Sequence, residues 1–349
     1  MNAIEAVELL KQMIAIPSLS RDEGAVADML QCYIERLGYQ VNRCHHNLWI
    51  KSKHWGCDKP TLLLDGHIDT VKPADGWQTD PFTPIEEDGK IIGLGSNDTG
   101  GSVVSLLATF LHLDKVEQPY NLIWLASTEE EVTGEHGIRA ALEALPEIDA
   151  AIVGEPTGMQ PATAERGLLV LDCKATGKAG HAARNEGINA IYEALPDIEW
   201  FKSYKFPKES EELGAVKMSV TGVQAGSLHN IVPAECTFMV DIRINDCYTN
   251  REIFDIVQRN VKCEVKARSF KHNSSHIDSS HPLVARCIEL GLKPFGSPTT
   301  SNQTAMNFPT LKIGPGQSSR SHTANECIYI SEIEQAIEQY IRILDGLKI

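Results

Sequence analysis

The order of the predicted secondary-structure elements changes along the 349-residue chain, and this change constrains the fold more than any other feature. In the first part, strand-like apolar runs alternate with helical periodicity, an order that favours an α/β layered sandwich. From about Gly167 the order becomes strand, helix, strand, strand, helix, strand, as in a ferredoxin-like unit. Later, helix and strand alternate again. We therefore expect a small α+β domain inserted into a larger, discontinuous α/β domain.

Hydrophobic periodicity and turn residues place the individual elements. In the larger domain, residues 1–164 and 274–349, we expect helices at 4–14, 26–37, 101–113, 135–145, 281–291 and 331–347, and strands at 47–51, 61–64, 121–127, 150–153 and 310–313. In the inserted domain, residues 165–273, we expect strands at 168–175, 215–222, 235–244 and 263–270 and helices at 187–204 and 250–260. The length of the chain also suits two hydrophobic cores.

Composition excludes two classes of partner. Lys and Arg total 32 against 47 Asp and Glu, and the formal net charge of −15 would repel a nucleic acid. No apolar run approaches the ~20 residues that a membrane span needs, and the start of the chain is unlike a signal peptide. The nine cysteines are scattered without a C-x-x-C pair, so we expect reduced core residues. Together these features predict a cytoplasmic protein.

Several short motifs place a histidine or an acid where a predicted strand meets a loop. The first contains His67 and Asp69, directly after the strand at 61–64. Open α/β sheets bind ligands at the carboxyl ends of their strands, and a carboxylate two residues beyond a histidine can hold its second ring nitrogen. Taken alone, such a pair is more often a polar pair on the surface.

The second motif surrounds Asp98. Residues 93–101 are rich in glycine, but they do not complete G-x-G-x-x-G and no G-K-[ST] pattern follows, so a nucleotide site is disfavoured. Asp98 stands at a turn before the predicted helix at 101–113. It would either cap that helix or bridge two metal ions from the same place.

Acids follow two further strands. After the strand at 121–127, three adjacent glutamates either face solvent or divide a task, with Glu130 binding a metal and Glu129 acting as general base for the attacking water. Glu155 follows the strand at 150–153, and the next residue, a proline, favours an extended conformation for it. An ordinary turn acid would show the same pattern.

A late histidine, His322, follows a glycine-rich segment near the end of the chain. By itself it would be a solvent-facing loop residue. However, it recurs with His67, Asp98, Glu130 and Glu155 where strands of the larger domain meet loops. Mixed imidazole and carboxylate ligands suit zinc and leave room for water, so the sequence predicts a catalytic zinc site.

In this order the motifs resemble those of the M20 family of metallopeptidases and deacylases, the group that contains acetylornithine deacetylase, succinyl-diaminopimelate desuccinylase and carboxypeptidase G. The similarity extends over nearly the whole chain. Its strongest segments are residues 66–70, 97–101, 128–130, 154–157 and 322–326. The resemblance implies a three-layer α/β/α zinc-peptidase-like catalytic domain with an inserted ferredoxin-like lid, through which the chain would form a homodimer.

The resemblance also implies roles for single residues. It implies two Zn²⁺ ions, which Co²⁺ could replace. One ion would be bound by His67 and Glu155 and the other by Glu130 and His322, and Asp98 would bridge the two ions. Asp69 would lie behind His67. Glu129 would be the general base.

Outside this set, three more residues match positions of the family and one departs from them. His181 resembles a lid histidine that reaches the partner's active site, where it would polarise the scissile carbonyl. Asn230 and Arg243 match lid positions that hold the substrate, and the planar fork of an arginine suits an α-carboxylate. Asn302 departs from the family, in which many members have an aspartate, so a hydrogen bond near the site would be retuned.

The function implied is that of a zinc-dependent amide hydrolase. It would remove an acetyl or succinyl group from an N-acyl-L-ornithine or related N-acyl-diamino acid in arginine or lysine biosynthesis. A succinyl tail would need an additional cation, for which the sequence offers Arg166, Lys178, Arg184 and Arg320. The alternatives are a metallo-dipeptidase or carboxypeptidase with the same metals, and a metal-retaining binding protein without turnover.

Overall fold

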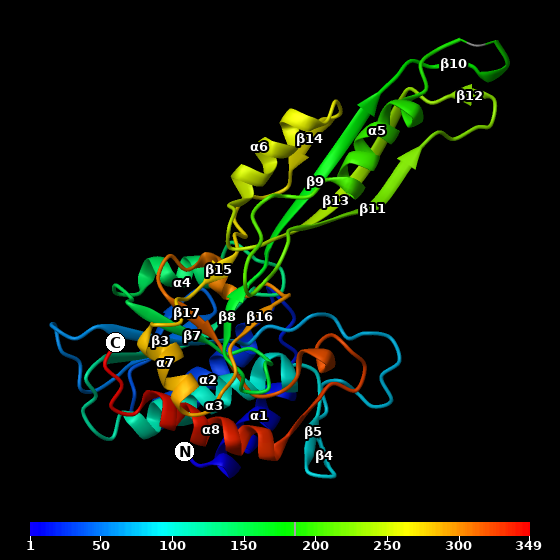
Figure 1. The fold of residues 1–349 in the computed structure, drawn as a ribbon. Coiled ribbons are helices and arrows are strands. Elements are labelled where there is room, and N and C mark those ends of the chain that lie inside the picture. Colours follow the sequence, from blue (N-terminus) through cyan, green and yellow to red (C-terminus); the bar gives the residue numbers. More distant parts are fainter. Residues whose placement is uncertain (185) are drawn as a thin grey trace. The chain divides into compact units, whose positions relative to one another are not determined.

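The computed structural model describes residues 1–184 and 186–349. Contacts within the chain divide it into two compact units (Figure 1). The large unit comprises Met1–Thr163, Ile277–Phe295 and Ser301–Ile349. The small unit comprises Ala164–His276 and Gly296–Thr300, so the chain leaves the large unit twice and returns to it each time.

The largest sheet has the strand order β1-β2-β6-β3-β7-β17-β8-β15, with β16 also paired to β8. Its strands are β1 (Asn42–Cys44), β2 (Asn47–Lys51), β3 (Thr61–His67), β6 (Asn121–Ser127), β7 (Ala150–Val153), β8 (Ala162–Glu165), β15 (Ser275–His276), β16 (Phe295–Ser297) and β17 (Thr310–Lys312). The central strands β6, β3, β7 and β17 are parallel. Their carboxyl ends therefore meet at one edge, where a ligand site is expected.

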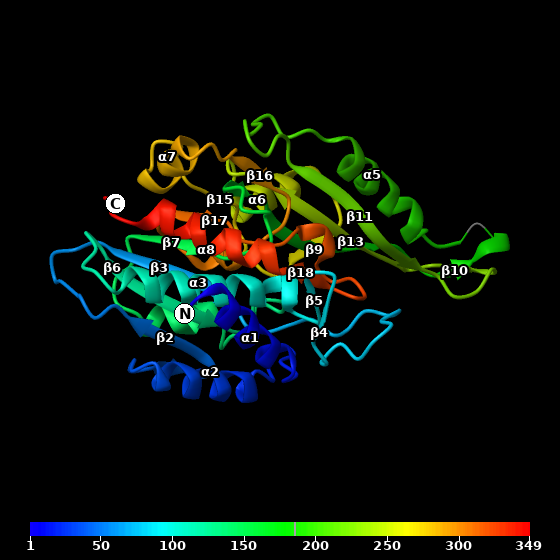
Figure 2. The ribbon, with the colours of Figure 1, turned by 90° about the horizontal axis from the view of Figure 1, so that it is seen from below.

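Helices cover both faces of the parallel strands, because alternate side chains of a strand point to opposite faces. Leu62 and Leu64 of β3 join a core with five helices, whereas Leu63 joins a second core with one further helix. The five helices are α1 (Ala3–Ile14), α2 (Gly24–Arg36), α3 (Gly101–Leu113), α7 (Pro282–Glu289) and α8 (Ile330–Leu344), and the single helix is α4 (Ile138–Ala144). Figure 2 shows α1, α3 and α8 side by side. The large unit is thus a three-layer α/β/α sandwich.

The small unit contains an antiparallel sheet in the order β11-β13-β9-β14. Its elements are β9 (Gly167–Thr176), α5 (Ala190–Ser203), β11 (Lys217–Ala225), β13 (Glu235–Ile244), α6 (Asn250–Asn260) and β14 (Glu264–Ala267). Both helices pack in one core with the sheet, where Leu171, Phe201 and Val257 are buried. This is the ferredoxin-like arrangement that the order of elements predicts.

All the expected helices and strands are present, with ends that differ by a few residues. Short strands were missed. Three of them, β4 (Ile85–Glu87), β5 (Lys90–Ile92) and β18 (Cys327–Tyr329), form a separate sheet, and β10 (Gly180–His181) pairs with β12 (Ile231–Val232) in the small unit. Such short strands have too few residues to show a period-two pattern.

Two other expectations concern the surface. Cys32 and Cys57 are exposed, so the prediction that the cysteines are core residues is wrong for these two. Within the described part of the chain, every helix is too short or too polar to cross a membrane.

Candidate metal centre

His67 ends β3 at the carboxyl edge of the parallel strands, and only 2% of its surface is exposed. Its Nδ1 lies 2.9 Å from the backbone oxygen of Asp69 and 3.5 Å from the Oδ1 of that residue. The carbonyl can only accept, so Nδ1 carries the hydrogen in the neutral ring. This leaves Nε2 available to bind a cation.

The carboxylate of Asp69 also forms hydrogen bonds with residues other than His67. Its carboxylate accepts hydrogen bonds from Ser20 Oγ at 2.8 Å and from the backbone N–H groups of Glu130 at 3.0 Å and Glu131 at 3.1 Å. Burial by itself raises the pKa of Asp69, but His67, Ser20 and the Glu130 N–H outweigh it and hold the pKa below its usual value. Asp69 thus joins the loop after β3 to the loop after β6.

Asp98 lies between the two histidines of the site. It belongs to the short helical turn η1 (Ser96–Gly100), directly before α3. Its Oδ1 lies 3.2 Å from His67 Nε2, and its Oδ2 lies 3.6 Å from His322 Nε2. One carboxylate therefore faces both imidazole rings, as a bridging ligand would.

Glu129 uses its carboxylate within its own loop. Its backbone has a φ of 54°, which is uncommon for a residue with a side chain, and this turns the chain sharply after β6. Its Oε2 accepts a hydrogen bond from the N–H of His136 at 3.3 Å. A Cβ atom on Gly134 would stand 1.5 Å from the same Oε2, so only glycine leaves room for this side chain.

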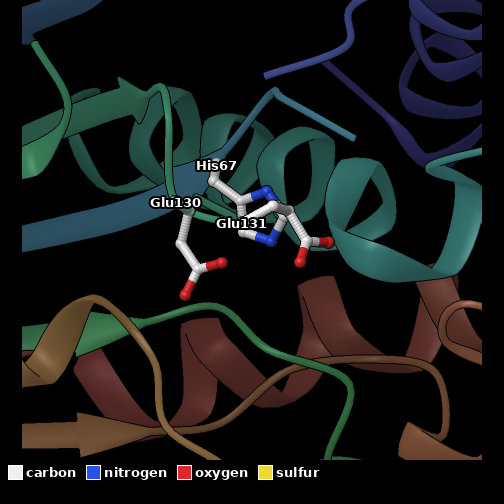
Figure 3. Close-up of side chains that lie close together, drawn as sticks. All are labelled: His67, Glu130 and Glu131. Carbon is white, nitrogen blue, oxygen red and sulfur yellow. The ribbon is translucent and has the colours of Figure 1, made fainter. Parts of the chain in front are cut away.

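Glu131 takes the position that the sequence suggested for Glu130. Its Oε1 lies 2.9 Å from His322 Nε2. The structure brings Glu131, and not Glu130, to His322, because the turn at Glu129 carries Glu131 to that histidine. Glu130 instead groups with His67 and Glu131 (Figure 3).

In each of three groups, possible metal-ligand atoms lie within 4.8 Å of one another. The groups are His67 with Glu130 and Glu131, His67 with Asp98 and Glu155, and Asp98 with Glu131 and His322. Asp98 belongs to two of them. Imidazole nitrogens and carboxylate oxygens in this mixture fit two divalent ions such as zinc that share Asp98.

The pKa values of three residues in the cluster are raised, and this also bears on metal binding. Burial, with the nearby charge of Asp98, raises the pKa of Glu155 to about 8. Burial, with the charges of Glu155 and Glu131, raises the pKa of Glu130 well above its usual range. The hydrogen bond with Glu131 raises the pKa of His322 to about 9. The cluster thus holds protons that divalent cations would displace, so metal binding and proton binding compete.

The three candidate residues of the small unit lie on its strands and loops. His181 on β10 pairs with Ile231, and the neighbouring Asn230 accepts a backbone hydrogen bond from Ala182 at 3.1 Å. His181 and Asn230 are therefore close and both are exposed. Arg243 lies on β13, where Asp241 holds its guanidinium through two hydrogen bonds of 2.8 and 3.1 Å.

Two of the four cations considered for a succinyl tail already have other partners. Arg166 is 6% exposed and donates to the backbone oxygens of Leu213 and Ala215. Arg320 donates to Glu332 and to the backbone oxygen of Cys327. Lys178 and Arg184 in the small unit are exposed.

Asn302 supports the strands beneath the site. It begins the short helix η3 (Asn302–Ala305), and its Nδ2 donates to Asp65 Oδ2 at 2.9 Å and lies 3.0 Å from Ser127 Oγ. Asp65 and Ser127 are fully buried on β3 and β6. The amide suits this place because it supplies a donor to a buried carboxyl group.

Asn302→Asp is expected to lower the free energy of unfolding by about 3 kcal/mol, because it removes that donor and sets two buried carboxyl groups against each other. Urea unfolding at neutral pH measures the change. The double variant Asp65→Asn/Asn302→Asp should recover most of the loss, since it restores one amide and one carboxylate. A single variant as stable as the unchanged protein would show that the Asp65 contact contributes nothing.

Comparisons with known proteins cover nearly the whole chain. The model of peptidase family M20/M25/M40 matches residues 63–346. The chain is 29% identical over 379 aligned positions to acetylornithine deacetylase from Proteus mirabilis (strain HI4320), covering 97% of this chain and 96% of that protein. It is 25% identical over 377 positions to succinyl-diaminopimelate desuccinylase 2 from Ruegeria sp. (strain TM1040), covering 98% and 95%.

A solved structure shares the fold. It is that of a dinuclear metal-binding peptidase of the M20 family from Bacillus subtilis, with a TM-score of 0.75 at 16% sequence identity, covering 98% of this chain and 97% of that one. The comparisons confirm the resemblance that the motifs indicated, together with the α/β fold class.

Proposed function

Because the chain belongs to peptidase family M20/M25/M40 and is a metal-dependent amidohydrolase, we propose that it removes an acetyl or succinyl group from an N-acyl-L-ornithine or a related N-acyl-diamino acid in arginine or lysine biosynthesis. The observation that carries this proposal is Asp98, which is shared by two groups of side chains that suit metal ions. The names of the two curated relatives, a deacetylase and a desuccinylase, support the substrate class.

The ligands divide into two sets with a shared member. We assign His67, Asp98 and Glu155 to one Zn²⁺, and Asp98, Glu131 and His322 to the other. Co²⁺ offers similar coordination. When bound, two such ions acidify a water molecule and polarise the amide carbonyl.

Glu130 is the residue best placed to move the proton. It lies beside His67 and Glu131 but is outside both proposed ligand sets, and its backbone N–H is fixed by Asp69. As a carboxylate it takes the proton of the attacking water, and as a carboxylic acid it returns that proton to the leaving amine. Asp69 keeps His67 in the tautomer that presents Nε2.

The small unit supplies the remaining roles as the lid of a homodimer. His181, contributed by the partner chain, stabilises the oxyanion that forms at the carbonyl. Asn230, beside it, holds the acyl amide. Arg243, whose guanidinium is aligned by Asp241, binds the α-carboxylate through two parallel hydrogen bonds.

A substrate panel tests the proposed function. The zinc-loaded protein is assayed with N-acetyl and N-succinyl forms of ornithine, citrulline, lysine and diaminopimelate, and with dipeptides that lack an acyl cap. We expect kcat/KM for the best acylated amino acid to exceed that for any dipeptide by at least about 10²-fold. Ornithine derivatives should rank first, and comparison of the two acyl groups identifies the natural one.

The competing function is that of a metallo-dipeptidase or carboxypeptidase. It is favoured by the fold similarity to the Bacillus subtilis peptidase. It requires faster cleavage of dipeptides than of any acylated amino acid, so that ranking in the same panel would overturn the deacylase proposal.

A further inference from the structure

Glu326 is a buried carboxylate that accepts three backbone hydrogen bonds from one turn. The side chain is 2% exposed. Its Oε1 accepts from the N–H groups of Asn97 and Asp98, both at 2.8 Å, and its Oε2 accepts from the N–H of Gly95 at 3.1 Å. Such a set of converging N–H groups forms an anion-binding concavity, which the chain fills with its own carboxylate.

The turn that Glu326 holds carries Asp98. This turn follows strand β5. Strand β5 pairs with β18, and β18 begins directly after Glu326. The backbone oxygen of Glu326 also accepts from Gly93 N–H at 3.0 Å. Both the side chain and the main chain of Glu326 therefore attach the turn to β18.

Glu326 is also only four residues beyond His322 in the sequence. The intervening residues form a tight loop, since His322 and Asn325 both have a φ of 58°. Because of this short connection, a shift of Glu326 would alter the position of His322 as well as that of Asp98. Glu326 is thus attached to the turn that carries Asp98 and lies close in the chain to His322, the two residues whose Oδ2 and Nε2 are 3.6 Å apart.

We propose that Glu326 is a positioning residue of the metal centre, which holds Asp98 and His322 at the separation that a shared cation requires. This inference rests on the proposed function, because it takes Asp98 and His322 as metal ligands. A carboxylate suits the task better than an amide, since both of its oxygens accept and its charge strengthens each hydrogen bond. Glutamine in its place would turn an NH₂ group towards a backbone N–H.

The test is Glu326→Gln, with metal affinity as the readout. Zn²⁺ is titrated into the metal-free protein in competition with a chromophoric chelator, and the dissociation constants of both sites are fitted. We expect the weaker site to lose about 10- to 100-fold in affinity, the range observed when a group that orients ligands is removed. Excess Zn²⁺ should then restore part of kcat, because every ligand and Glu130 are retained.

Asp197→Asn is the matched control. Asp197 is 4% exposed and accepts backbone hydrogen bonds from Lys262 and Cys263, but it belongs to the small unit. The two substitutions remove the same kind of buried interaction. Asp197→Asn should therefore lower the unfolding midpoint comparably while leaving both zinc dissociation constants unchanged.

Three outcomes separate the possibilities. Weaker zinc binding in Glu326→Gln alone supports the positioning role. Unchanged affinity in Glu326→Gln, or an equal loss in Asp197→Asn, overturns it and leaves Glu326 as a stability residue only. If the unchanged protein itself binds no zinc, the proposed function fails first, and this result is distinct from the other two.

Discussion

Glu130→Gln is expected to lower kcat by about 10²- to 10⁴-fold, the contribution of a general base, while about two Zn²⁺ per chain remain bound. The physical reason is that an amide cannot take a proton from water, whereas the assigned ligands His67, Asp98, Glu131, Glu155 and His322 are unchanged. Steady-state kinetics and metal analysis of the same preparation measure both quantities. A shift in the pH profile of any residual activity would show that the titrating group has been removed.

Glu129→Gln is the control for this prediction. The carboxylate of Glu129 accepts from the backbone of His136, and an amide oxygen can accept the same hydrogen bond. Turnover should therefore stay within a few-fold of normal. The reverse result, with a large loss in Glu129→Gln and little in Glu130→Gln, would restore the roles suggested by the sequence and contradict the assignment of Glu130 as the base.

The fold could be predicted far more completely than the site. Alternation along β3, which sends Leu62 and Leu64 to one core and Leu63 to the other, is a local pattern that depends only on the period of a strand. The order of elements likewise identified the ferredoxin-like arrangement of the small unit. Strands of two or three residues, such as β10 and β18, are defined by distant pairing partners and have no such local signal.

The difference of one residue at the acidic segment has a specific physical origin. Glu129, Glu130 and Glu131 are chemically identical neighbours, so composition and spacing cannot tell which of them reaches the histidine. The choice is made by the backbone, through the positive φ of Glu129 and the attachment of the next two N–H groups to Asp69. A sequence pattern does not specify a dihedral angle of this kind when the residue is not glycine.

Local sequence patterns also could not predict which residues hold the loops that carry the ligands. Glu326 stands within a motif that the sequence identified, but its main-chain partners lie as far as 231 residues earlier in the chain. Glu23 accepts from the backbone of Glu129 across 106 residues and carries no motif at all. Both are acids whose partners are main-chain N–H groups, and main-chain groups leave no signature in the sequence.

Glu131→Ala is expected to reduce bound zinc from about two ions to about one per chain, because it leaves Asp98 and His322 as the only proposed ligands of that ion, fewer than the three protein ligands usual at catalytic zinc sites. kcat should fall by at least about 10²-fold, as when a group that stabilises developing charge is removed. Equilibrium dialysis followed by elemental analysis measures the stoichiometry.

The neighbouring alanine variants decide whether this loss is specific to position 131. Glu129→Ala removes a carboxylate of the same loop that lies outside the described ligand groups, so it should keep about two Zn²⁺ per chain. If Glu130→Ala lost an ion while Glu131→Ala kept both, the assignment would have to move back by one residue. His322→Ala should match Glu131→Ala in stoichiometry, since His322 Nε2 and Glu131 Oε1 lie 2.9 Å apart and are proposed to serve the same ion.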